Sequence, residues 1–127
     1  MPRRLAPIVL AGLALAIVAW WIGLFASVEF RALFVEEHGW PNLVSFVLGD
    51  LALAGVTAWT ARRAGHPGTT LRVGLTCGGW GYAAAWSCIA ALHGLARPLG
   101  AWLMLAGFAL VVLASHALVS TRTAGRD

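Results

Sequence analysis

Residues 42 to 61 read NLVSFVLGDLALAGVTAWTA, a run long enough to cross a bilayer that carries one acid, Asp50, near its middle. About 20 predominantly apolar residues span the hydrocarbon core as a helix. A carboxylate within such a span is costly unless it faces other protein or water. We therefore expect the rest of the chain to surround Asp50 with further helices.

The composition of the whole chain is that of a membrane protein. Of 127 residues, 60% are hydrophobic and 11% are charged, and the mean hydropathy is +0.80. A soluble domain of this size is far less apolar. All the basic residues are arginines that fall in short segments between and beyond the apolar runs. This distribution is typical of topology signals and not of a nucleic-acid surface, so we predict contact with the lipid bilayer and none with nucleic acid.

Three further apolar runs accompany the first. The N-terminal run follows Arg3 and Arg4, as a secretory signal does, but it is longer than a usual signal core and lacks a small-residue cleavage site, so we interpret it as a retained helix. The predicted fold class is all-α, a polytopic membrane protein with a single transmembrane domain over residues 1–127. Its antiparallel bundle of four transmembrane helices is expected at about 7–28, 42–61, 73–92 and 99–120.

The arginines predict the orientation of this bundle. Two of them, Arg31 and Arg97, fall on the side opposite the termini. The side shared by both termini and the second connection holds Arg3, Arg4, Arg62, Arg63, Arg72, Arg122 and Arg126. Because short cytoplasmic segments carry an excess of positive charge, both termini are predicted to be cytoplasmic, in a multi-pass protein of the cell (inner) membrane. The acidic connection before Pro41 then faces out.

Rows of small residues mark one face of the first and third predicted helices. The row on the third helix is Gly74, Gly78, Gly81, Ala85 and Cys88, and the row on the first is Gly12, Ala16, Ala19, Gly23 and Ala26. Small residues let helix backbones approach closely where lipid supplies no hydrophobic drive for pairing. We expect the third helix to be the centre of packing, and both rows to be contact faces.

The candidate site lies toward the outer half of the predicted bundle. Asp50 is eight residues from Asn42, or ~12 Å along a helix, and Glu29 and His93 belong to the same end. One hypothesis is a polar pocket, open to the outer face and floored by Asp50, with Asp50 as general acid or base and Glu29 or His93 assisting. The alternative is a structural Asp50, bonded to a serine, a tryptophan or the backbone of a neighbouring helix. Candidate ligand-binding rings, suited to an apolar or cationic group, are those of Trp20, Trp21 and Trp86.

Asp50 also shares its helical face with Ala54, Thr57 and Ala61. This face is small and polar, so we predict that it points at protein and not at lipid.

Metal, cofactor and disulfide chemistry are not indicated. No HxxxH or ExxH pair lies on any one helix, so no metal site is predicted. Cys77 and Cys88 are eleven residues apart, or ~16 Å along a helix, which is beyond disulfide reach. No motif calls for a cofactor.

Three functions stay open on this reading. The first, which we favour, is a binding or accessory component that holds a partner subunit, a second copy of the chain or a lipid. The second is an intramembrane enzyme that acts on a lipid or isoprenoid chain through Asp50. The third is a small transporter that relays protons through Asp50. The first is favoured because no complete catalytic set can be recognised.

Overall fold

The computed structural model describes residues 1–120, and this part of the chain is helical apart from short connections. The prediction of an all-α fold is confirmed. Within the described residues, the only extended pairing is an isolated bridge between Val35 and Ala96. The helices are α1 (Ala6–Ala26), α2 (Val28–Ala32), the short 3-10 helix η1 (Glu37–Gly39), α3 (Trp40–Val44), α4 (Val47–Arg62), α5 (Thr69–Leu92) and α6 (Pro98–Val119).

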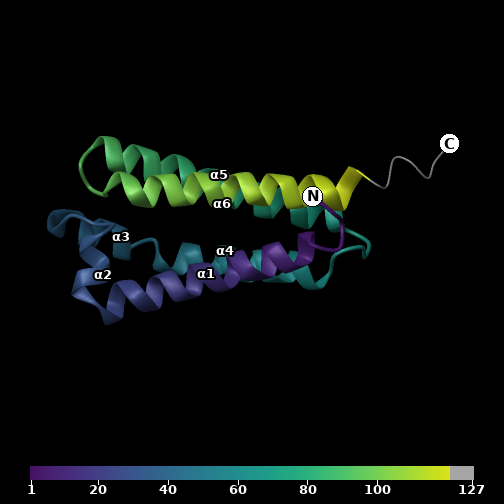
Figure 1. Ribbon diagram of the computed structural model, residues 1–127, viewed down its shortest axis with the longest axis horizontal. Helices are drawn as coiled ribbons and strands as arrows, with labels where there is room; N and C mark the ends of the chain where they lie inside the picture. Colours follow the sequence, from purple (N-terminus) through teal and green to yellow (C-terminus); the bar gives the residue numbers. More distant parts are fainter. Residues whose placement is uncertain (121–127) are drawn as a thin grey trace.

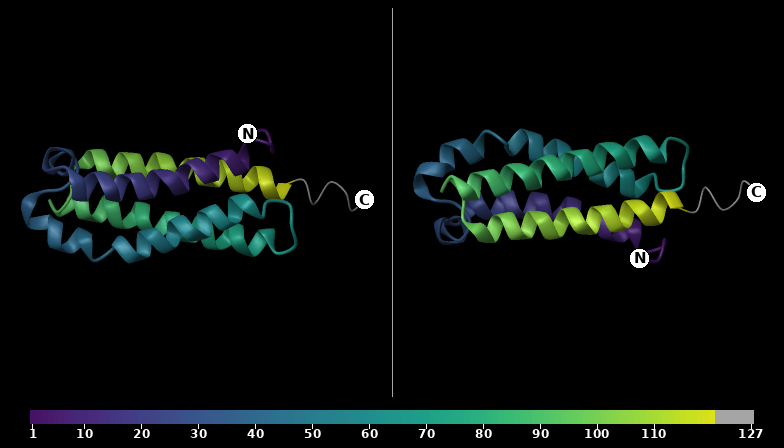
Figure 2. Two further views of the ribbon diagram at one scale, coloured as in Figure 1. Left: turned by 90° about the horizontal axis from the view of Figure 1, so that it is seen from below. Right: turned by 90° about the horizontal axis from the view of Figure 1, so that it is seen from above.

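The four long helices lie side by side as two pairs (Figures 1 and 2). One pair is α1 with α4, and the other is α5 with α6; α1 also contacts α6, and α4 contacts α5, so the four form a ring. The short helices α2 and α3 lie at one end together with the turn between α5 and α6, and we call this the α2–α3 end. The N-terminus and the connection between α4 and α5 lie at the opposite end, the loop end.

Two helices, α1 and α6, are long and apolar enough to cross a membrane. The segment Glu37–Val44 and helix α4 qualify as one further span when joined across a bend of 56°. These two apolar helices indicate a membrane-embedded protein, as the composition predicted.

The helix predicted over residues 42–61 is broken, and this corrects the expectation of one straight span. The break falls at Ser45 and Phe46, between α3 and α4. The Ser45 hydroxyl donates to the carbonyl oxygen of Asn42 at 2.6 Å, and the Phe46 N–H bonds to the carbonyl of Leu43, three residues back. These local bonds tighten the turn and interrupt the regular helical ladder, which is a recognised cause of a sharp kink.

The other predicted boundaries shift by smaller amounts. The first helix ends at Ala26 because Ser27 adopts an extended conformation and caps α2 instead. The third begins at Thr69, four residues before the predicted start, directly after Gly68, whose φ of +77° only glycine adopts readily. Pro41 lies in the first turn of α3, and α6 starts at Pro98, one residue before the predicted limit.

The prediction of the α5 packing face is right at Gly81, where a Cβ would lie 3.3 Å from the Phe108 ring of α6, but wrong over most of the row. Gly74, Gly78 and Ala85 are exposed, while Thr76 and Trp80 are buried on the opposite side of the helix. The reason is hydrogen bonding, since Thr76 and Trp80 both bond to threonines of α4 and must point inward. The small row of α5 therefore forms part of the outer surface.

Helix α1 likewise turns its larger side chains inward. Its buried residues recur at intervals of three and four, as expected for one helix face, and they are Ala6, Leu10, Ala14, Ile17, Trp21 and Leu24. Of the small row on α1, Gly12, Ala19 and Ala26 are exposed. Ala16 of this row is exposed as well, whereas a Cβ at Gly23 would lie 2.7 Å from the Phe30 ring of α2.

A clasp joins the two helix pairs at the α2–α3 end. It consists of residues 34–36, after α2, and residues 96 and 97, before α6. The guanidinium of Arg97 pairs with the Glu36 carboxylate at 3.2 Å, and the Arg97 N–H donates to the carbonyl oxygen of Phe34 at 2.8 Å. Together with the bridge between Val35 and Ala96, these contacts fix the end of one pair to the end of the other.

Candidate functional site

An apolar cavity of about 390 Å³ lies between the two helix pairs. Its walls come from all four long helices, with Leu43 of α3 and Phe46 of the break added. Asp50 is the only charged residue among those that line it. The sequence predicted a polar pocket above Asp50, and the observed walls are apolar instead, because aliphatic and aromatic side chains of α1, α5 and α6 fill the space around the acid.

The cavity opens toward the outside of the helices. Four of its lining residues are exposed, one on each long helix: Ala16, Gly49, Tyr82 and Leu103. The cavity is therefore accessible from outside the helices and not fully enclosed.

Asp50 lies at this cavity and is bonded to α1. Its Oδ2 accepts a hydrogen bond from Nε1 of Trp21 at 3.0 Å, and Trp21 is 3% exposed. The prediction that its helical face points at protein is confirmed, because Ala54, Thr57 and Ala61 are all buried. The second carboxylate oxygen, Oδ1, accepts no hydrogen bond from any described residue. Asp50 thus connects two helices and keeps one oxygen available to a ligand.

The three tryptophans singled out from the sequence all lie at or beside the cavity. Trp20 and Trp86 line it, while Trp21 contributes the hydrogen bond to Asp50. The break in the second span brings Phe46 against Trp86, with ring centroids 4.2 Å apart. The kink between α3 and α4 therefore supplies part of the aromatic wall.

Trp80 closes the cavity on the side of the loop end, a role that the sequence analysis missed. Its indole N–H donates to the Thr57 hydroxyl at 3.1 Å, and its ring lies so close to Gly107 that a Cβ there would approach it to 2.5 Å. A further bond joins the hydroxyls of Thr60 and Thr76 at 2.8 Å. A tryptophan in the middle of a span, away from either interface, was the available signal, since buried indoles seek a partner.

Glu29 and His93 do not line the cavity. Glu29 is exposed beyond the end of α1, and its carboxylate accepts a hydrogen bond from the Ser27 hydroxyl at 2.9 Å. Its own backbone N–H, and then this hydroxyl, lower the pKa of Glu29 below its usual value. His93 is exposed at the end of α5. The structure therefore does not bring these two residues together with Asp50.

No three His, Cys, Asp or Glu side chains within residues 1–120 converge as metal ligands would. Cys77 and Cys88 are both free thiols, and Cys77 bonds to the Ser115 hydroxyl across the α5–α6 interface at 3.1 Å.

Comparison with models of known families, with curated proteins and with solved structures finds no match for this chain. The cavity and its side chains are thus the basis for assigning a function.

Proposed function

We propose that all four long helices cross the membrane, and that the protein is a binding or accessory component that holds a lipid-like molecule in its central cavity. The observation that carries this proposal is an apolar cavity with one carboxylate oxygen left open. Ligand sites are typically concave spaces of roughly 300–1,000 Å³ with apolar walls and a few placed polar groups. An apolar chain with a hydroxyl or amino head that bonds to Asp50 matches this site.

The distribution of side chains on α5 supports a span there too. Beside its small row, this helix turns five large apolar side chains outward, namely Leu71, Leu75, Tyr82, Ile89 and Leu92. Its hydroxyl-bearing Thr76 and the indole N–H of Trp80 point inward and are bonded. A helix in water places its polar groups outside, whereas a helix in lipid must satisfy them within the protein.

The placement of charge supports an inner-membrane orientation with cytoplasmic termini. Arg3, Arg4, Arg62 and Arg63 belong to the loop end, while the acidic segment that includes Glu36 lies at the α2–α3 end. Excess positive charge favours the cytoplasmic side, which puts the loop end in the cytoplasm. Arg122 and Arg126, which entered the same prediction, lie outside the described residues.

Filling the cavity tests the proposal. Gly49 lines it and has open space where a Cβ would be, so Gly49→Leu should occupy the cavity without disturbing the backbone. Gly12→Leu is the matched control, because Gly12 is also a helical glycine with open space but lies outside the cavity.

The measurement is thermal unfolding in neutral detergent against a panel of lipids, isoprenoid alcohols and quinones. A ligand that binds only the folded state, at a hundred times its Kd, stabilises by roughly 2.7 kcal/mol. The expected result is a higher Tm for the parent protein and Gly12→Leu, and no shift for Gly49→Leu. An unchanged shift in Gly49→Leu would exclude the central cavity as the binding site.

The open oxygen of Asp50 also supports a second candidate, an intramembrane enzyme acting on a lipid or isoprenoid substrate, or a small transporter that relays protons. Both need a titrating carboxylate at the ligand. Asp50→Asn preserves the acceptor for Trp21 and removes the proton-transfer group. A variant that binds ligand but loses turnover or proton coupling supports this candidate, and a fully active Asp50→Asn protein eliminates the enzyme and the transporter together.

A further inference from the structure

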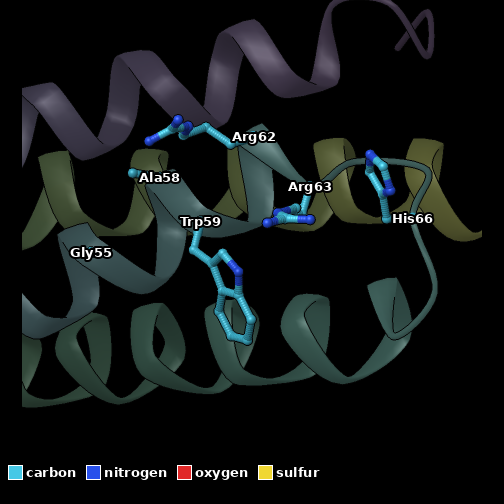
Figure 3. A pocket seen from close by; sticks show the side chains of 6 residues that line it. All are labelled: Gly55, Ala58, Trp59, Arg62, Arg63 and His66. Atoms are coloured by element: carbon cyan, nitrogen blue, oxygen red, sulfur yellow. The ribbon is translucent and has the colours of Figure 1, made fainter.

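A second pocket, of about 520 Å³, lies on α4 at the loop end. Unlike the central cavity, it is basic. Its lining residues are Gly55, Ala58, Trp59, Arg62, Arg63 and His66 (Figure 3). Figure 3 shows the Arg62 side chain toward α1, the Trp59 ring toward α5, and His66 on the connection that follows α4. Two guanidinium groups, an imidazole and an indole therefore surround one space.

The two guanidinium groups in this pocket have no acidic partner in the described part of the chain. Arg62 and Arg63 are exposed and form no ion pair within residues 1–120. The acids of that range are Asp50, at the central cavity, and Glu29, Glu36 and Glu37, at the α2–α3 end. The pocket thus presents guanidinium groups that an external anion can neutralise.

A buried arginine behind the pocket fixes the backbone of the connection that follows α4. Arg72, 7% exposed, donates to the carbonyl oxygen of Arg63 at 2.9 Å and to that of His66 at 3.3 Å. Its guanidinium also lies 5.3 Å from the centroid of the Trp59 ring. One side chain therefore contacts three of the six lining residues. A site that is ordered before binding loses less conformational entropy when the ligand arrives.

We propose that this pocket binds a phosphate group through Arg62 and Arg63. The planar fork of a guanidinium pairs with two phosphate oxygens at once, which makes arginine the side chain of choice for this anion. The phosphodiester of an anionic membrane lipid and a free phosphate share this chemistry. Gly55 and Ala58 continue the pocket along α4 toward the apolar part of the helix, and the space at Gly55 is open. The site is separate from the central cavity and does not depend on what occupies it.

The test measures binding of three probes to the purified full chain in neutral detergent by native mass spectrometry and thermal shift. The probes are short-chain phosphatidylglycerol, short-chain phosphatidylcholine and inorganic phosphate. Phosphatidylglycerol is expected to bind and phosphatidylcholine is not. Since each arginine near an anionic headgroup contributes about fivefold in affinity, replacing Arg62 and Arg63 by glutamine should weaken phosphatidylglycerol binding by about 25-fold.

Charge-matched variants separate a built site from general attraction. Arg3→Gln with Arg4→Gln removes the same charge near the same end but changes no lining residue, so it should weaken phosphatidylglycerol binding much less than the Arg62 and Arg63 variant does. Arg62→Lys with Arg63→Lys keeps the charge and loses the paired geometry of the guanidinium groups. Its affinity for phosphatidylglycerol should therefore lie between those of the Arg3 and Arg4 variant and the double glutamine variant at Arg62 and Arg63. If the double glutamine variant does not fold, as judged by its melting without ligand, Arg62→Gln alone gives the comparison.

The outcomes are distinct. Binding of phosphatidylglycerol without inorganic phosphate supports a lipid headgroup as the source, and binding of both supports a site that also accepts free phosphate. The proposal is overturned if neither phosphatidylglycerol nor inorganic phosphate binds the parent protein. It is also overturned if the Arg3 and Arg4 variant weakens binding as much as the Arg62 and Arg63 variant. The central-cavity proposal is tested by Gly49→Leu, which leaves this pocket unchanged, so the two can fail independently.

Discussion

The hydrogen bond from Trp21 to Asp50 can be measured with a double-mutant cycle. The variants are Trp21→Phe, Asp50→Ala and the two combined. Trp21→Phe also loses packing, because its side chain is almost fully buried, and Asp50→Ala also removes the rest of the carboxyl group. The cycle cancels both single effects and leaves the energy of interaction between the two side chains.

The geometry sets the expected magnitude at about 1 kcal/mol. The Nε1 to Oδ2 distance of 3.0 Å is ordinary for an N–H···O bond. Hydrogen bonds to charged groups contribute about 1.5–3 kcal/mol in soluble proteins, whereas bonds between membrane helices average about 0.6 and reach about 1.7 kcal/mol. Asp50 is only half-buried and lines an open cavity, so we expect a value within the membrane range. A coupling of about 1 kcal/mol changes the ratio of folded to unfolded protein by about fivefold.

The assay is reversible unfolding by titration of a denaturing detergent into mixed micelles. Trp20→Phe provides the matched control, because Trp20 also lines the cavity but has no hydrogen bond to Asp50. Its coupling with Asp50→Ala should be near zero. A coupling below about 0.3 kcal/mol for the Trp21 cycle, which is within the additivity expected of independent sites, would refute a stabilising role for this bond.

Three further predictions follow from local contacts. Gly107→Ala should destabilise the protein by roughly 1–3 kcal/mol, as overpacking does, because its Cβ would lie 2.5 Å from the Trp80 ring; thermal unfolding measures this. Arg72→Met should cost on the order of 1–3 kcal/mol through the carbonyl groups left without donors, and protease cleavage in the α4–α5 connection should increase. Glu29 has a lowered pKa in the folded protein, so its carboxylate stabilises the folded state above the unfolded pKa, and this stabilisation is lost as the pH falls through the folded pKa. Ser27→Ala should reduce this acid sensitivity in melting curves recorded from pH 7 to pH 3.

Each of these has a control or a contradicting result. Gly100→Ala on the same helix should be nearly neutral, since its Cβ would lie 3.9 Å from Trp20, an ordinary contact. Equal melting of the Gly107 and Gly100 variants would place Trp80 elsewhere. Unchanged proteolysis of Arg72→Met would show that the connection is ordered without that side chain. Identical pH profiles for Ser27→Ala and the parent protein would mean that this hydroxyl does not stabilise the Glu29 carboxylate.

The predictions that succeeded rest on long-range composition and on one costly residue. A run of apolar residues has few alternatives to a helix, so α1 and α6 end within two residues of their predicted limits. The cost of a carboxylate among apolar residues predicted which face of α4 turns inward, and the buried Thr57 confirms it.

The failures arise where the sequence pattern has two physical solutions. A row of small residues fits against a neighbouring helix, but it also tolerates the outer surface, and on α5 the bonded Thr76 and Trp80 determine that it faces out. The kink at Ser45 and Phe46 is accompanied by two local hydrogen bonds, to Asn42 and Leu43, that no periodicity of the sequence indicates. The cavity depends on how far apart two helix pairs are held, a distance that no periodicity in the chain encodes.

The clasp at the α2–α3 end also has a consequence for biogenesis. Phe34 and Glu36 leave the ribosome about sixty residues before Arg97, the residue that binds both. Helices α1 and α4 can associate as soon as residue 62 has been synthesised, but the clasp has to wait for the turn before α6. The cavity, whose last wall is Leu103 to Gly107, is therefore completed only at the final stage of synthesis. A chain arrested before that point contains Asp50 and its tryptophan partner without the α6 wall of the cavity.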